Sequence, residues 1–100
     1  PEGEVPRQMS RTSGYDLRLT APAERQLAAL PTKVAAAIVE FMVGPLVEDP
    51  ERVGAQLHRE LAGLRSARRG AYRVVYEIDE HRCLVIIHLI DHRADVYRPR

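Results

Sequence analysis

Residues 64–76 read L-R-S-A-R-R-G-A-Y-R-V-V-Y, and this stretch decides the fold. From residue 72 to residue 78 the side chains alternate in character, which predicts a strand. The alternation places Tyr72 and Tyr76 on a core face and Arg73 on the opposite face. Residues 64–69 predict a second, irregular strand, and a bend between the two would bring their arginines alongside each other.

The flanking segments supply the other elements. Residues 15–19 alternate in the same way, and residues 83–90 form a nearly continuous apolar run, typical of a central strand buried on both faces. Helical spacing between these regions predicts two helices, one with an N-cap at Thr20 and one that restarts at Thr32 after Pro31. The sequence therefore predicts an α+β fold of order β-α-α-β-β-β, a small antiparallel or mixed sheet with an N-terminal helical hairpin packed on one face.

The connections are predicted from proline, glycine and charge. The second helix is expected to reach about residues 43–47, where the Gly-Pro pair at 44–45 and then Pro50 close it. Residues 51–61 are expected to form a loop with a helical turn. Residues 79–82 are predicted to turn between the two long strands, which would set Arg73 beside residues 87–89. A short last strand is expected at residues 96–97.

The chain has 100 residues, which suits a single domain. Residues 1–14 are polar and without a period, so we expect a disordered or extraneous tail there and a folded domain over residues 15–100. The single cysteine, Cys83, excludes an internal disulfide and fits a reducing cytosol, which predicts a cytoplasmic protein. No apolar run approaches the roughly 18–20 residues that span a bilayer, so no membrane segment is expected.

The net charge of +1 hides a local excess of arginine. Between residues 59 and 76 five arginines stand against one acid, Glu60. The five are Arg59, Arg65, Arg68, Arg69 and Arg73. A basic surface on a nearly neutral protein indicates a specific anionic contact, while a solvated arginine-rich face is the plainer alternative.

Groups that can move protons follow the central strand. His92 and Arg93 come directly after the apolar run, and Tyr97 follows shortly. A histidine can act as base or acid near neutrality, whereas Tyr97 could be a base only if nearby arginines lower its pKa. With Arg73 to hold phosphate, these groups suit metal-independent cleavage of RNA by attack of a 2′-hydroxyl on the adjacent phosphate.

Structural interpretations stay open beside this one. Arg73 can pair with Glu77 or with an acid on a neighbouring strand. His88 lies within the apolar run and is interpreted as a hydrogen-bonded core histidine. The four histidines do not match zinc spacing and no glycine-rich phosphate loop is present, so no metal and no cofactor is expected.

The chain from about residue 15 to residue 98 resembles the RelE/ParE superfamily of bacterial toxins, and within it the RelE-like ribosome-dependent mRNA interferases. The resemblance rests on A-E-R-Q-L-A-A-L-P in the first helix, on L-x-G-L-R-S-A-R-R-G-A-Y-R-V-V-Y-E-I-D, and on I-I-H-L-I-D-H-R-A-D-V-Y-R. The H-R-x-x-x-Y ending favours RelE over ParE. It implies a toxin of a type II toxin–antitoxin system, an endoribonuclease that cuts mRNA in the ribosomal A site and so inhibits translation and growth.

The resemblance also assigns site residues. Arg73 matches the strand arginine of the active site, Arg93 the arginine after the central strand, and Tyr97 the C-terminal tyrosine. His92 is expected to take part in proton transfer beside them. The basic segment expected to bind RNA carries Arg65, Arg68 and Arg69.

This chain departs from the family pattern in that basic segment. Two lysines usually lie there, whereas the nearest aligned positions are Leu64 and Ser66, which leaves the identity of the base open. The expected partners are a cognate antitoxin, the ribosome and mRNA, with promoter DNA bound only through the antitoxin. Two alternatives stay open: a ParE-like inhibitor of DNA gyrase without nuclease activity, and a catalytically weak member that mainly binds its antitoxin.

Overall fold

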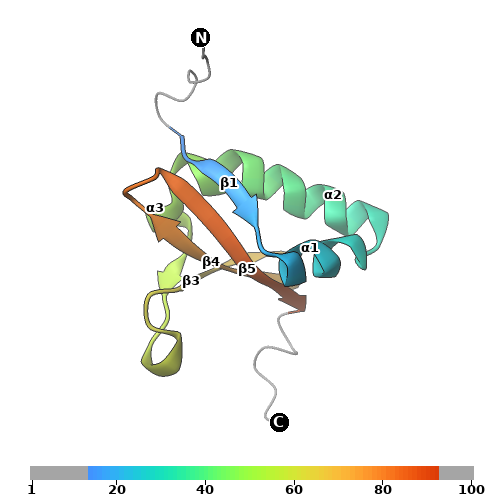
Figure 1. Ribbon diagram of the computed structural model, residues 1–100. Helices are drawn as coiled ribbons and strands as arrows, with labels where there is room; N and C mark the ends of the chain where they lie inside the picture. The colour runs from blue at the N-terminus through green and yellow to red at the C-terminus, as the bar shows by residue number, and fades with distance from the viewer. Residues whose placement is uncertain (1–13, 93–100) are drawn as a thin grey trace.

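The computed structural model describes residues 14–92, which form one mixed β-sheet with helices packed against it (Figure 1). In chain order the elements are β1 (Asp16–Leu19), α1 (Ala21–Ala28), α2 (Thr32–Phe41), the π-helical turn η3 (Met42–Leu46), α3 (Pro50–Val53), β2 (Ala55–Gln56), the 3-10 turn η4 (Arg59–Leu61), β3 (Arg65–Arg69), β4 (Tyr72–Asp79) and β5 (Leu84–His92). The α+β fold predicted from the sequence is confirmed. Most of the predicted tail, the predicted strand at residues 96–97, Arg93 and Tyr97 lie outside the described residues.

The five strands lie in the order β1-β5-β4-β3-β2. β1 pairs with β5 in parallel, and every other pair of neighbours is antiparallel. The apolar run therefore does form an inner strand, between β1 and β4, as its composition predicted. The two-residue strand β2 is an addition to the predicted order, and it pairs with β3 at the edge of the sheet.

The hydrophobic core lies between the sheet and the helical hairpin. Ile38 and Met42 are almost completely buried against Tyr76 and Ile87 of the two long strands. The first helix begins as predicted, because the backbone N–H of Ala23 donates to the Thr20 side chain at 3.3 Å. Both helices contribute to this one core, so they cover one face of the sheet, and the other face carries Arg73 and Glu77 on either side of the buried Val75.

The second helical stretch ends in the predicted region, at residues 43–47, but its last turn is π-helical. α2 itself stops at Phe41, and the chain continues through the π-helical turn η3, which contains Pro45. The hydrogen bonds of a π-helical turn span five residues and not four. This wider turn has room for the proline ring, and the turn continues although proline has no N–H to donate. Leu46 at the end of this turn is fully buried, so the continuation adds to the core.

The register of the long hairpin also differs from the prediction. Asp79 pairs with Leu84, so the turn lies one residue later than expected, and a bulge between Val75 and Tyr76 shifts the partner further. Arg73 is consequently opposite Asp91, and not beside residues 87–89. A bulge inserts one extra residue into one strand and leaves no signature in the alternation of its partner.

Candidate functional site

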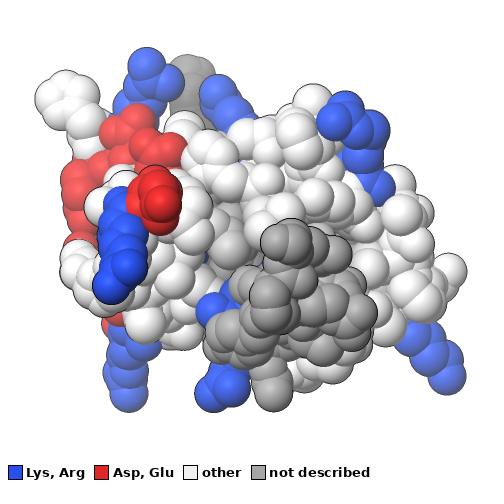
Figure 2. Space-filling model, turned by 90° about the horizontal axis from the view of Figure 1, so that it is seen from below, with Lys and Arg blue, Asp and Glu red and all other residues white. Residues whose placement is uncertain are grey.

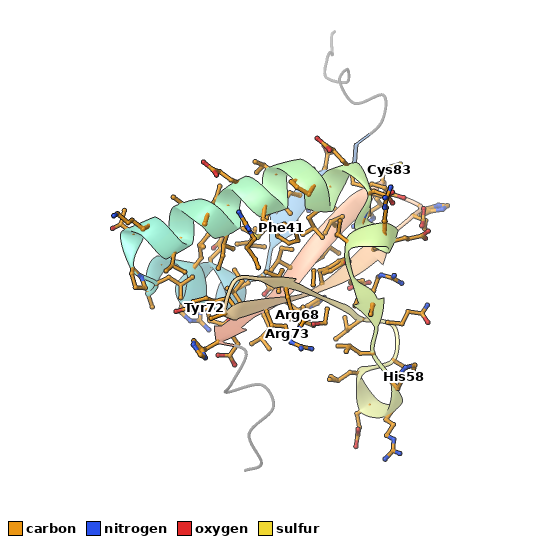
Figure 3. The ribbon with its side chains drawn as sticks, turned by 180° about the vertical axis from the view of Figure 1, so that it is seen from behind. Phe41, His58, Arg68, Tyr72, Arg73 and Cys83 are labelled. Atoms are coloured by element: carbon orange, nitrogen blue, oxygen red, sulfur yellow. The ribbon has the colours of Figure 1, made fainter. Side chains whose placement is uncertain are left out.

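Two arginines face each other across the β3–β4 hairpin. Arg68 pairs directly with Arg73, as the predicted bend required. The hairpin turns at Gly70, where φ is +63°, a left-handed conformation that glycine adopts without strain. Figure 3 shows the two arginines side by side on neighbouring strands, with Phe41 on the side of α2.

The next strand adds an acid to this row. Asp91 of β5 is opposite Arg73, so Arg68, Arg73 and Asp91 lie in line across three strands. The alternation of β4 sets this row on the face away from the helices, because Val74 and Tyr76 fill the core on the other face. Like charges directly opposite each other destabilise a pair of strands, and an anion held between two guanidinium groups removes that repulsion.

His92 is held at the end of β5 on the other side of the sheet. It is opposite Tyr72, and the two rings meet edge to face with their centres 5.2 Å apart. A shallow hollow there is bounded by His92, Tyr72 and Leu30. The described part of the chain therefore does not bring His92 onto the same face as Arg73.

The predicted RNA-binding arginines also separate. Arg69 is opposite Tyr72 and lines a cavity with Lys33 and Val34 of α2, so it lies on the helical side. Arg68 is exposed and lies opposite Arg73, and it also lines a hollow with Arg69, Phe41 and Pro45. Figure 2 shows basic side chains standing apart on the face it presents, with the acids gathered at one end.

Arg65 has a structural contact that its sequence position did not predict. One of its terminal guanidinium nitrogens donates to the backbone carbonyls of Glu51 at 2.7 Å and Gly54 at 3.0 Å. These bonds attach the segment around α3 and β2 to the edge of β3. An arginine can satisfy several carbonyls at once through its five N–H donors.

Beside Arg65, the phenol of Tyr76 is buried and donates a hydrogen bond to the Pro50 carbonyl. Burial raises the pKa of the Tyr76 phenol above its ordinary value, and the nearby Arg65 guanidinium offsets part of that rise. Tyr76 is thus a core residue, as predicted, with its hydroxyl used to hold the α3 segment.

His88 lies in a different place from the predicted one. Its Nε2 forms a hydrogen bond with Oε1 of Glu77 at 3.0 Å, which confirms that it is hydrogen-bonded. The side chain is 37% exposed, so its assignment to the core is wrong. The bulge in β5 explains the difference, because the extra residue breaks the alternation that an apolar run implies. The sequence carried one usable signal, a polar residue at each of positions 77 and 88 on strands predicted to pair.

Within residues 14–92, no group of three histidine, cysteine or acidic side chains is placed to hold a metal ion. In the same part of the chain, every helix is too short or too polar to cross a membrane.

Comparison with known proteins gives a consistent family. Residues 17–97 match the family described as "ParE toxin of type II toxin-antitoxin system, parDE". The chain is 52% identical to toxin RelG of Mycobacterium tuberculosis over 84 residues, which cover 84% of this chain and 97% of RelG. It is 48% identical to toxin RelE of the same organism over 97 residues, which cover 92% of this chain and 100% of that RelE.

Solved structures show the same fold. The toxin–antitoxin complex RelBE2 of Mycobacterium tuberculosis contains a chain that is 50% identical, with a TM-score of 0.79 and coverage of 84% of this chain and 97% of that one. The isolated RelE toxin of E. coli is 18% identical, with a TM-score of 0.67 and coverage of 83% and 90%. At that identity the second likeness concerns the fold alone.

Proposed function

The chain belongs to the ParE toxin family of type II toxin–antitoxin systems, and from that premise we propose that it is a metal-independent endoribonuclease that cleaves mRNA in the ribosomal A site. The observation that supports this most is the opposed pair Arg68 and Arg73 on the open face of the sheet. Two guanidinium groups at this spacing suit a phosphate whose charge grows during the reaction.

In the proposed reaction the 2′-hydroxyl of one nucleotide attacks the phosphorus that follows it. Arg68 and Arg73 stabilise the pentacovalent phosphorane, and Arg93 adds a third cation. His92 and Tyr97 serve in proton transfer to the departing 5′-oxygen or in positioning a base. Arg69 contacts the RNA backbone next to the row, at the turn of the β3–β4 hairpin, while Arg65 supports the site by holding the α3 segment. Pre-positioned cations act strongly because they need no reorganisation as charge develops.

The test is primer extension on a defined mRNA in a translation extract. Wild type should cut within translated codons, and Arg73→Ala should lower the cleavage rate by about 10²–10³-fold. Arg25→Ala is the matched control, because it removes one exposed arginine from α1 on the other side of the sheet. Cleavage by Arg73→Ala at the wild-type rate would remove Arg73 from the site.

A second candidate function follows from the family description, which names ParE. A ParE-like toxin would inhibit DNA gyrase as a binding protein, without cutting RNA. Measured with purified gyrase, loss of supercoiling with fully intact mRNA would establish this alternative. Intact supercoiling together with cut mRNA would exclude it.

We infer a cognate antitoxin as the partner, in the cytosol where ribosomes are found. The RelBE2 structure is of a toxin–antitoxin complex, and the E. coli RelBE structure is another. Promoter DNA would be bound only through the antitoxin. Co-expression of the chain with a candidate antitoxin should yield a complex that shifts promoter DNA, whereas the chain alone should not.

A further inference from the structure

A histidine and a carboxylate form a pair on the open face of the sheet. His88 Nε2 and Glu77 Oε1 are 3.0 Å apart, and the two side chains are 37% and 43% exposed. Glu77 shares its face of β4 with Arg73, because both alternate with the buried Val74 and Tyr76. The pair is therefore accessible from the same side as the arginine row.

The bulge in β5 is what points His88 to this face. Val75 pairs with Leu89 and Tyr76 pairs with Ile87, so His88 is the extra residue without a directly opposite partner. Bulges redirect a side chain and are frequent beside active sites. Without the bulge, a regular alternation would carry the chain past Glu77 without this contact.

His88 lies close enough to the arginine row for one stretch of RNA to contact both. His88 precedes Asp91 by three residues on β5, which corresponds to about 10 Å along the strand. An extended arginine side chain covers much of that length. The positions between are filled by Val75, Leu89 and, on β3, Ser66, none of which is a base near neutrality.

This arrangement bears on the missing lysines of the basic segment. Ser66 occupies one of those positions, opposite Val75, and cannot accept a proton at neutral pH. Leu64 occupies the other, and continuing the β3–β4 register by one residue sets Leu64 next to Glu77. A histidine–carboxylate pair thus lies beside the place where the family usually has a cation.

We propose that His88 is the general base of the cleavage reaction and that Glu77 positions it; this inference rests on the proposed function. When the Nε2–H donates to Glu77, the Nδ1 of His88 carries a lone pair. That lone pair takes the proton of the 2′-hydroxyl, and the oxygen forms a bond to the adjacent phosphorus. The bond from phosphorus to the 5′-oxygen breaks, the 5′-oxygen takes a proton from water, and His88 then returns its proton to solvent, which leaves a 2′,3′-cyclic phosphate and a 5′-hydroxyl.

The experiment measures single-turnover cleavage of mRNA on programmed ribosomes, with binding to the same ribosomes measured separately. His88→Gln keeps an amide donor for Glu77 and removes the base, so it should fold and bind as wild type while the cleavage rate falls by about 10²–10³-fold. His88→Ala should fall by a similar factor and recover part of its rate when imidazole is added. His81→Ala is the control, since it removes an exposed histidine from the turn before β5 and should cleave normally.

Glu77→Gln tests the positioning role. Its cleavage rate at saturation should fall by about tenfold with unchanged binding, because the carboxylate acts through His88 and not on RNA. Cleavage by His88→Gln at the wild-type rate, or His88→Ala that imidazole does not rescue, would overturn the proposal. If Arg73→Ala is inactive while His88→Gln is active, only this inference fails. If wild type leaves mRNA intact, the proposed function fails with it.

Discussion

Arg65 and Arg68 lie three residues apart on β3, and the strand turns them to opposite faces of the sheet. Arg65 is half-buried and donates to the Glu51 and Gly54 carbonyls, so its charge is used to fasten a loop. Arg68 is exposed and lies opposite Arg73, where its charge is available to a ligand. Strand alternation, more than local composition, therefore decides what each arginine of this basic segment does.

The largest loss of stability is expected at Gly54, in the segment around α3 and β2 that Arg65 holds. Gly54→Ala would set a methyl group against the Tyr76 hydroxyl and 2.9 Å from the Ser66 carbonyl oxygen. Overpacking against backbone should lower the free energy of unfolding by about 3 kcal/mol, measured by urea denaturation. Gly44→Ala is the matched control, because the new methyl would meet no atom within 4 Å apart from those of its chain neighbours and its own helical turn. Equal losses in the two variants would mean that the loop is not packed as described.

Replacing Arg65 and Arg68 one at a time tests whether the first stabilises the fold and the second does not. Arg65→Met should lose about 2 kcal/mol of unfolding free energy, because two carbonyls lose a charged donor. Arg68→Met should stay within about 0.5 kcal/mol of wild type, as surface changes usually do. In the cleavage assay we expect Arg68→Met to cut mRNA more slowly than wild type, although its free energy of unfolding is nearly unchanged. A reversed order of stabilities would show that the register of β3 is shifted by one residue.

Tyr76→Phe removes the hydroxyl beside Arg65 and should cost about 1 kcal/mol at neutral pH. It should also change how the free energy of unfolding depends on pH in alkaline solution. Burial raises the folded pKa of Tyr76 above its ordinary value of 10.0, so its contribution is complete below about pH 10 and is lost as pH rises through the folded pKa. Unfolding free energies measured between about pH 8 and pH 11 should fall less steeply for Tyr76→Phe. An identical slope would show that the phenol is not buried.

The smallest effect should come from the start of α1, remote from both arginines. Thr20→Ala removes the side-chain acceptor of the Ala23 N–H and should cost about 0.5 kcal/mol, measured as a lower midpoint in urea. Thr32→Ala is the comparison and should leave stability nearly unchanged, because the N-cap of α2 is Pro31 and no side chain caps this helix. A loss in Thr32→Ala as large as in Thr20→Ala would contradict the capping geometry.

Elements with a clear period could be predicted from the sequence. The alternation of residues 72–78 predicted β4 and the outward direction of Arg73, and the Thr20 cap predicted the start of α1. The pairing of Arg68 with Arg73 followed from a short bend at glycine. Periodicity is a local property, so it carries these features directly.

Features set by long-range contacts could not be predicted. The two residues of β2 have no pattern of their own and are held by β3 and Arg65. The bulge that turns His88 toward Glu77 depends on how two strands are paired, and it shifted the predicted partner of Arg73. Arg65 looks like its neighbours in sequence, and only the loop that lies over it reveals its structural contact.

The parallel pairing of β1 with β5 has a consequence for how the molecule folds. It joins Asp16 to Leu84, near opposite ends of the described chain, whereas the β3–β4 hairpin closes over two residues. Closing a long loop costs entropy before its contacts form, so the hairpin is expected early in folding and the β1–β5 contact late. The arginine pair is thus assembled locally, but a chain interrupted before Leu84 has no strand on which β1 can dock. Folding rate should therefore respond to changes in the hairpin, and unfolding rate to changes in β1.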